Sequence, residues 1–170
     1  MASVNQTRRT ATPEETRALA HPLRLRIIRL LYDQPLSNKM LATRLDEHPA
    51  TVLHHVRTLA RTGFVEPAGE QPGARGTVEK LYRSTGKSWE LSIDEPDDAI
   101  AVSRAGLDAF AVELREAGDD FDMSRVALTI TPERRLELQT RMLALLDEYA
   151  GHDDADGERW AIFVAYHRRA

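Results

Sequence analysis

The segment HPATVLHHVRTLARTGFVE, residues 48–66, has two different faces when it is drawn as a helix. Pro49 suits the first turn of a helix and Gly63 suits a left-handed end, so the spacing predicts a helix between them. At 3.6 residues per turn, three apolar residues fall within about 60° of one another: Val52, Val56 and Leu59. The opposite side carries polar and basic residues. The chain must therefore bury one face of this helix in a core and leave the other face for solvent or a partner.

The sequence on either side of this helix predicts more helices and a β-hairpin. Thr12 and Glu15 match a capping box, Pro22 suits the start of the next helix, and a short helix is expected from Ser37. The hairpin has three parts in chain order: a strand from Phe64, a Gly/Pro-rich turn over residues 69–76 and a strand over residues 77–84. Elements of this kind in this order predict a winged helix-turn-helix domain over residues 12–92.

The rest of the chain predicts a second domain. Residues 95–98, EPDD, mark a boundary, and the domain is expected over residues 96–170. Its predicted elements are helices over residues 99–117 and 132–149, a half-buried strand over 125–130, and a strand buried on both faces over 159–166. The expected fold class is therefore α+β, with a winged helix-turn-helix domain followed by a small α/β carboxy-terminal domain for dimerisation and effector binding.

Charge is distributed unevenly along the 170 residues, whose net charge is −4. Residues 21–87 hold 11 Lys/Arg and 6 Asp/Glu, whereas residues 88–170 hold 9 Lys/Arg and 19 Asp/Glu. A basic binding module joined to an acidic one is typical of nucleic-acid binders. The sequence has no cysteine, which excludes disulfides, thiolate metal sites and cysteine nucleophiles. Without an apolar signal core or a long apolar run, a cytoplasmic protein with no membrane partner is expected.

The polar face of the helix after Pro49, together with the hairpin, is the candidate DNA-binding surface. Its residues are Ala50, Thr51, Leu53, His54, Arg57, Thr58 and Arg61 on the helix, and Arg75, Lys80 and Arg83 on a hairpin that is expected to be basic. A recognition helix presents its amino-terminal residues to base edges in the major groove of double-stranded DNA. Arg57 can donate two hydrogen bonds to a guanine and Leu53 can pack on a thymine methyl, whereas Arg61 is expected to bind phosphate. Arg75 is expected in the minor groove.

Other interpretations of these residues remain open. The polar face is also typical of a solvated helix, and a winged helix can act as a protein–protein interaction module without sequence-specific DNA binding. His54 and His55 point about 100° apart and cannot share one metal ion, so His55 is expected to be packed and hydrogen-bonded on the core side. The acidic turn with Asp153, Asp154, Asp156 and Glu158 lacks the spacing and the glycine of an EF-hand loop. No set of nucleophile, base and orienting residue is found, so no enzyme is predicted.

Three stretches together resemble the ArsR-type winged helix-turn-helix transcriptional regulators: ALAHPLRLRIIRLL, ATVLHHVRTLARTGFVE and EKLYRSTGKSW. The similarity spans roughly residues 14–91 and implies a homodimeric repressor that binds an inverted repeat and is released by an effector. The arsenic and antimony sites of that family use cysteines, and the corresponding stretch here, SNKMLATRLDE, has none. Its carboxy-terminal zinc sites pair Asp with His, but only His152 and His167 follow residue 90. The chain resembles the longer, metal-free members, so no metal site and no cofactor are expected.

The segment after residue 95 is longer than a dimer contact requires. The apolar face over residues 99–117, helped by the helix over 132–149, is expected to join two copies of the chain. Four aromatic residues are candidates for a pocket that takes a small organic effector: Phe110, Tyr149, Trp160 and Phe163. The alternative is that they fill a small core. The acidic charge of this segment favours a neutral or cationic effector over an anionic one.

Overall fold

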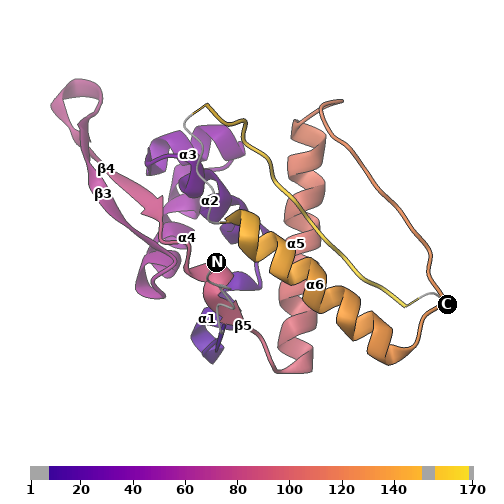
Figure 1. The fold of residues 1–170 in the computed structure, drawn as a ribbon. Helices are drawn as coiled ribbons and strands as arrows, with labels where there is room; N and C mark the ends of the chain where they lie inside the picture. The colour runs from indigo at the N-terminus through magenta and orange to yellow at the C-terminus, as the bar shows by residue number, and fades with distance from the viewer. Residues whose placement is uncertain (1–7, 151–155, 169–170) are drawn as a thin grey trace. The chain divides into compact units, whose positions relative to one another are not determined.

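The computed structural model describes residues 8–150 and 156–168, apart from the side chain of Arg75. The chain divides into two compact units, Arg8–Asp120 and the part that begins at Phe121. The elements of the first unit are β1 (Arg9–Thr10), α1 (Pro13–Leu19), α2 (Pro22–Asp33), β2 (Leu36–Ser37), α3 (Asn38–Leu45), α4 (Pro49–Arg61), β3 (Val65–Pro72), β4 (Val78–Ser84), β5 (Leu91–Ser92) and α5 (Pro96–Glu116) (Figure 1). The predicted mixture of helix and sheet, with a winged helix-turn-helix in the amino-terminal part, is confirmed.

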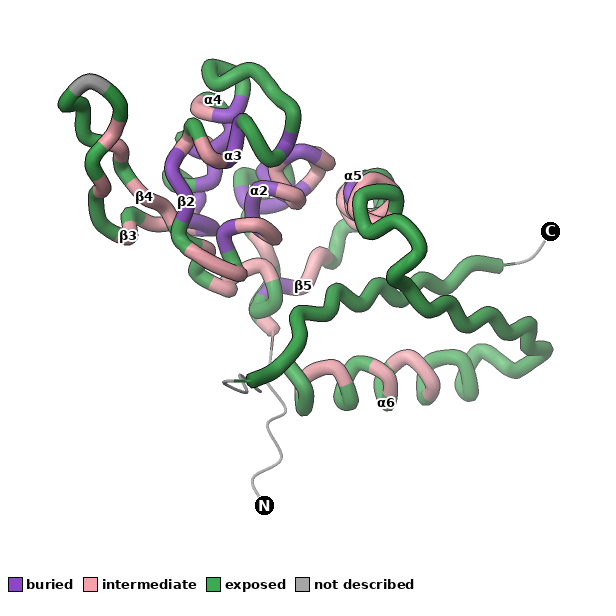
Figure 2. The backbone as a smooth tube through the Cα atoms, turned by 90° about the horizontal axis from the view of Figure 1, so that it is seen from above, coloured by how far each residue is buried: buried purple, intermediate pink, exposed green. Residues whose placement is uncertain are grey.

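The three apolar residues of α4 lie at the centre of the core. Val52, Val56 and Leu59 are each 0% exposed. They belong to one cluster of buried residues to which α1, α2, α3, α4 and the start of β3 all contribute (Figure 2). Burying one side chain of this kind stabilises the fold by about 1.5–3 kcal/mol relative to leaving that side chain in water. This packing fixes α4 to the rest of the first unit, so its opposite face points away from the core.

Side-chain caps define the short helix α3. Ser37 caps it, because its Oγ accepts a hydrogen bond from the Met40 amide. Asp46 ends it in the left-handed region, with φ of 52°. Asn38 then connects α3 to the next helix, because its Nδ2 donates to the Pro49 carbonyl oxygen at 3.0 Å. The turn between α3 and α4 is thus closed by a side chain as well as by the core.

Caps also define the two ends of α4. His48 is the cap residue at its start, and its Nδ1 accepts from the Ala50 amide. Gly63 follows the helix with φ of 74°, the left-handed conformation that its sequence position predicts. Phe64 is then directed back into the core, and β3 begins at the next residue.

The wing is the hairpin of β3 and β4, and it has a third strand that the sequence analysis did not predict. The sheet order is β2-β4-β3, and both pairs are antiparallel. β2 has two residues, Leu36 and Ser37, which pair with Tyr82 and Leu81 of β4. The expected turn over residues 69–76 is also shorter, because β3 continues to Pro72 with an irregularity between Pro67 and Glu70.

The helix α5 packs on the winged domain and belongs to the same compact unit. Ala105 and Ala109 are its buried residues, in a helix that contacts α1 and α2. Arg26 of α2 forms an ion pair with Glu116 near the end of α5. The compact unit therefore continues to Asp120, whereas the expected domain boundary lay between residues 92 and 96.

The part that begins at Phe121 contains α6 (Pro132–Ala150), close to the predicted helix. The strands predicted over residues 125–130 and 159–166 are wrong, because neither segment is in a strand and both are exposed throughout. An alternating pattern provides a strand with an apolar face, but the strand forms only when another strand accepts its backbone hydrogen bonds. Within residues 8–150 and 156–168, no helix has the length and apolar character that a membrane span requires.

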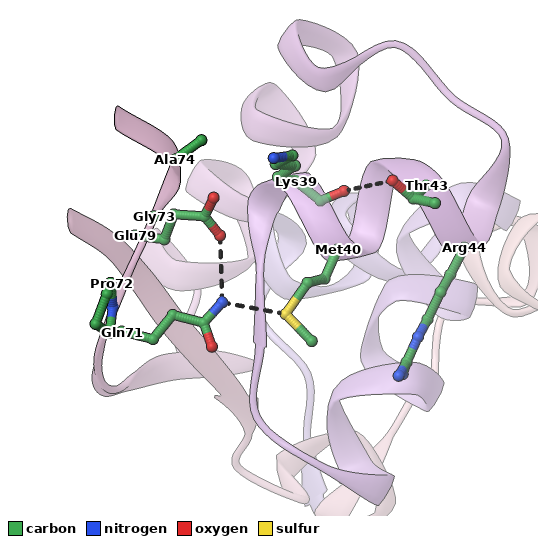
Figure 3. A pocket seen from close by; sticks show the side chains of 9 residues that line it. All are labelled: Lys39, Met40, Thr43, Arg44, Gln71, Pro72, Gly73, Ala74 and Glu79. Atoms are coloured by element: carbon green, nitrogen blue, oxygen red, sulfur yellow. Dashed lines mark hydrogen bonds between the residues drawn. The ribbon is translucent and has the colours of Figure 1, made fainter. Parts of the chain in front are cut away.

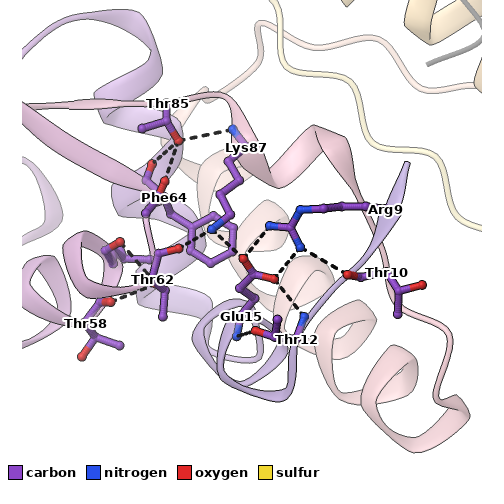
Figure 4. Close-up of polar contacts among 11 residues, drawn as sticks. Arg9, Thr10, Thr12, Glu15, Thr58, Thr62, Phe64, Thr85 and Lys87 are labelled. Atoms are coloured by element: carbon purple, nitrogen blue, oxygen red, sulfur yellow. Dashed lines mark hydrogen bonds and ion pairs between the residues drawn. The ribbon is translucent and has the colours of Figure 1, made fainter. Parts of the chain in front are cut away.

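A buried carboxylate joins four parts of the first unit (Figure 4). Glu15 of α1 accepts from Arg9 Nη2 at 2.6 Å, pairs with Lys87 Nζ at 2.6 Å and accepts from the Thr12 amide at 2.8 Å. The Lys87 ammonium also donates to the carbonyl oxygen of Thr62 at the end of α4. The hydrogen bonds from Arg9, and then those from Lys87 and Thr12, hold the pKa of Glu15 well below its usual range.

Glu15→Gln is expected to reduce the free energy of unfolding at neutral pH by about 1–2 kcal/mol, because charged hydrogen bonds are lost. Since the pKa of Glu15 is lower in the folded than in the unfolded chain, the ionised group stabilises the fold above its unfolded pKa, near 4.5, and this contribution is lost in stronger acid. The variant should therefore lose less stability than the wild type between about pH 5 and pH 3. Urea unfolding at several pH values measures this, with exposed Glu14→Gln as the control. Parallel pH profiles for wild type and Glu15→Gln would contradict the prediction.

Candidate nucleic-acid interface

The outer face of α4 is free of core packing. Ala50, Thr51, His54, Arg57 and Arg61 are exposed, and Leu53 and Thr58 are half-buried at its edges. The Thr58 hydroxyl donates to the His54 carbonyl oxygen at 3.2 Å, so its proton is used within the helix. The structure thus brings the seven predicted contact residues of α4 onto one side or its borders, opposite the buried valines and leucine. Their contacts with DNA remain a prediction.

A histidine pair lies beneath this face. His55 is 7% exposed, and its ring contacts that of His21 in a tilted arrangement, with centroids 4.5 Å apart and an interplanar angle of 50°. Burial, helped by the charges of His21 and Arg24, lowers the pKa of His55 to about 4. His55 is therefore neutral at neutral pH, and the positive charge of α4 comes from Arg57 and Arg61 on the outer face.

The packing expected for His55 is confirmed, but the expected hydrogen bond is wrong for one ring nitrogen. Within the described part of the chain, Nδ1 of His55 is buried and has no hydrogen-bond partner, and the same holds for Nδ1 of His21. His54 contacts the pair edge-on, with its ring centroid 5.5 Å from that of His55. The His55 ring thus contributes packing on the core side of α4.

The wing differs from its expected basic character. Residues 65–84 carry three acidic and three basic residues. Arg83 lies opposite Glu66 in the strand register, and its Nε donates to a Glu66 oxygen at 2.7 Å. Lys80 is exposed, and the side chain of Arg75 lies outside the described residues. The prediction of a basic hairpin is wrong, because its three acidic residues balance its three basic ones, and Arg83 pairs with Glu66 across the strands.

The predicted effector residues belong to both units. Phe110 is half-buried on α5 in the first unit. Tyr149 is 65% exposed on α6, and Trp160 and Phe163 lie in the exposed segment near the carboxyl end. The alternative that these aromatics fill a small core is wrong for Tyr149, Trp160 and Phe163, because all three side chains are exposed. A pocket for a small organic effector stays a prediction.

Metal-ligating side chains do not gather in the part of the chain that the structure describes. No group of three or more His, Asp or Glu side chains that could hold a metal ion occurs there. Asp153 and Asp154 of the acidic turn lie outside the described residues, and Asp156 and Glu158 are exposed.

The match to a known domain coincides with these elements. Residues 19–68 match the family described as "Helix-turn-helix domain", from the end of α1 to the middle of β3. This segment is a helix-turn-helix domain. The helix-turn-helix domain contains all of α2, α3 and α4. The turn lies between α3 and α4, so the exposed face of α4 belongs to the helix that directly follows the turn.

The chain is also similar to solved structures, at low levels. Reduced HlyU from Vibrio cholerae has 22% identity over 52% of this chain and 77% of its own, with a TM-score of 0.33. An apo mutant of Lactococcus lactis ZitR has 19% identity over 76% of this chain and 83% of its own, with a TM-score of 0.37. The adhesin competence repressor AdcR from Streptococcus pyogenes has 17% identity over 87% of this chain and 86% of its own, with a TM-score of 0.31. No curated protein matches the chain. Scores this low transfer no function to the helix-turn-helix domain.

Proposed function

We propose that this protein is a transcriptional regulator that binds double-stranded DNA in a sequence-specific manner through α4. The observation that carries the proposal is the orientation of α4, whose apolar face is fully buried in the helix-turn-helix domain while His54, Arg57 and Arg61 are exposed on the other side. A helix after such a turn fits the major groove, and its exposed arginines match guanine edges and phosphates. A solvated helix face needs no arginine at these positions.

The finer parts of the proposal concern assembly and regulation. A short recognition helix covers few base pairs, so two copies acting on an inverted repeat supply useful specificity. The resemblance to ArsR-type regulators supports a homodimeric repressor of that class, located in the cytoplasm and without enzymatic activity or cofactor. The exposed side of α5 supports the dimer, because Ile100 and Leu107 are 50% and 53% exposed and lie about 20° apart around the helix.

Selection of bound duplexes from a random DNA pool tests the proposed function. Enrichment of a two-fold symmetric site, with half-sites about 10 base pairs apart or a multiple of that spacing, would support it. An unenriched pool would contradict it, and a protein–protein interaction module would then be the better explanation of the exposed face of α4.

Leu107→Glu is expected to convert a dimer into a monomer, because it places a charge in the proposed α5 contact. Leu107 is exposed in the single chain, so the fold of the first unit should be unaffected. Sedimentation at micromolar concentration measures the assembly state, and binding of the selected duplex should weaken with it. Ala101→Glu is the matched control, since Ala101 is exposed and lies about 120° from Leu107 around α5. A wild-type chain that is monomeric and binds a single half-site at full strength would contradict the dimer.

A further inference from the structure

An open groove of about 390 Å³ lies between α3 and the wing (Figure 3). Lys39, Met40 and Thr43 of α3 line one side, and Gln71 and Glu79 line the other. One polar contact, between Gln71 and Met40, connects the two sides. Gln71 Nε2 lies 3.4 Å from the Met40 sulfur and donates to Glu79 Oε2 at 3.3 Å. The side chains of Gln71 and Met40 therefore meet across the groove.

Two exposed cations of α3 line this groove, Lys39 and Arg44, and Lys39 lies at its upper end (Figure 3). Within the described part of the chain its ammonium group has no hydrogen bond or ion pair in the structure, whereas Thr43 donates to its carbonyl oxygen. The neighbouring Asn38 is hydrogen-bonded to the Pro49 carbonyl oxygen at the start of α4. Lys39 therefore follows, in the chain, a residue that contacts the end of α4 that the proposed function directs toward the bases.

Glu79 is a fixed negative charge in the same groove. Its Oε2 accepts from Ser37 Oγ at 2.6 Å and from Gln71 Nε2. The Ser37 hydrogen bond, then that of Gln71, and also the charge of Lys39 lower the pKa of Glu79. At neutral pH the groove thus holds the ionised Glu79 carboxylate and, besides Arg44, the Lys39 ammonium group, which can take another anion.

We propose that Lys39 binds a phosphate of the DNA backbone at this groove, and that Glu79 opposes the phosphate and limits the strength of the contact. This inference rests on the proposed function. A lysine ammonium binds phosphate as a point charge, and such a contact positions a protein on a duplex without reading its sequence. The fixed carboxylate repels the same phosphate, so the groove adds only part of the affinity that Lys39 would give alone.

Binding of the selected duplex and of a random duplex, measured between 50 and 200 mM salt, tests this proposal in the full chain. Lys39→Gln should weaken both complexes by a similar factor of several-fold and reduce the slope of log affinity against log salt by about 0.9. Glu79→Gln should strengthen both complexes by a similar factor, since its amide oxygen can still accept the Ser37 hydrogen bond. Arg17→Gln is the control, because it removes the same charge from an exposed residue of α1.

The possible failures can be told apart. If Lys39→Gln matches Arg17→Gln, or weakens only the selected duplex, the phosphate contact is overturned. If Glu79→Gln leaves both affinities unchanged, its opposing role is overturned. In either case Arg57→Ala still reports on the proposed function separately. A wild-type chain that binds no duplex overturns the proposed function and this inference together. Thermal melts of each variant show that the fold is retained.

Discussion

Arg57→Ala should weaken binding to the selected duplex by about 1–3 kcal/mol, which corresponds to roughly 5- to 150-fold in affinity. Arg57 is exposed on the outer face of α4, one turn after His54 and on the side away from the buried valines. An arginine there can donate two parallel hydrogen bonds to a guanine, and alanine can donate none. The variant should also tolerate substitutions at one base pair of the site. Titration of the selected duplex, its single-base variants and a random duplex measures both effects.

Arg61→Ala is the matched control for this experiment, because Arg61 is exposed one turn later on the same helix. It is expected to bind phosphate, so its loss should weaken the selected and random duplexes equally and flatten the salt dependence. Neither substitution touches the core, so unfolding should be unchanged. Equal losses on selected and random DNA for Arg57→Ala would show that Arg57 does not read a base.

Phe64→Ala should reduce the free energy of unfolding by about 3–5 kcal/mol. Phe64 is 1% exposed and lies between the end of α4 and the start of the wing. Its amide donates to the Leu59 carbonyl oxygen at 2.9 Å, its carbonyl oxygen accepts from the Thr85 amide at 3.1 Å, and the Lys87 ammonium lies 5.1 Å from its ring centroid. Removing the ring leaves a cavity where α4, β3 and β4 meet, so the angle between the recognition helix and the wing is also loosened.

Urea unfolding measures this loss, and Phe64→Leu supplies the comparison, because leucine fills part of the space with a smaller expected cost. DNA affinity of Phe64→Ala, measured where the variant is still folded, should fall on selected and random duplexes alike. A loss of less than about 1 kcal/mol would mean that the surrounding helices close over the cavity and that Phe64 does not set this angle.

The sequence alone determined the elements that rely on local chemistry. The capping box at Thr12 and Glu15, the positions of Pro22 and Pro49, and the left-handed Gly63 all lie where the spacing predicted. The apolar face of α4 and its polar opposite face were predicted for the same reason, since helical periodicity needs only the residues of one segment. This is why the helix-turn-helix domain and its candidate DNA-binding face could be found before the structure.

Tertiary structure decided everything that depends on residues distant in the chain. Pairing with β4 turned Leu36–Ser37 into a strand, and the strand register placed Arg83 beside Glu66, where the two form an ion pair. Burial in the core, and then the neighbouring His21 just before α2, lowers the pKa of His55. Residues 125–130 and 159–166 had the pattern of strands but not the structure. A helix satisfies its hydrogen bonds within itself, whereas a strand, an ion pair or a shifted pKa requires a partner that only the fold supplies.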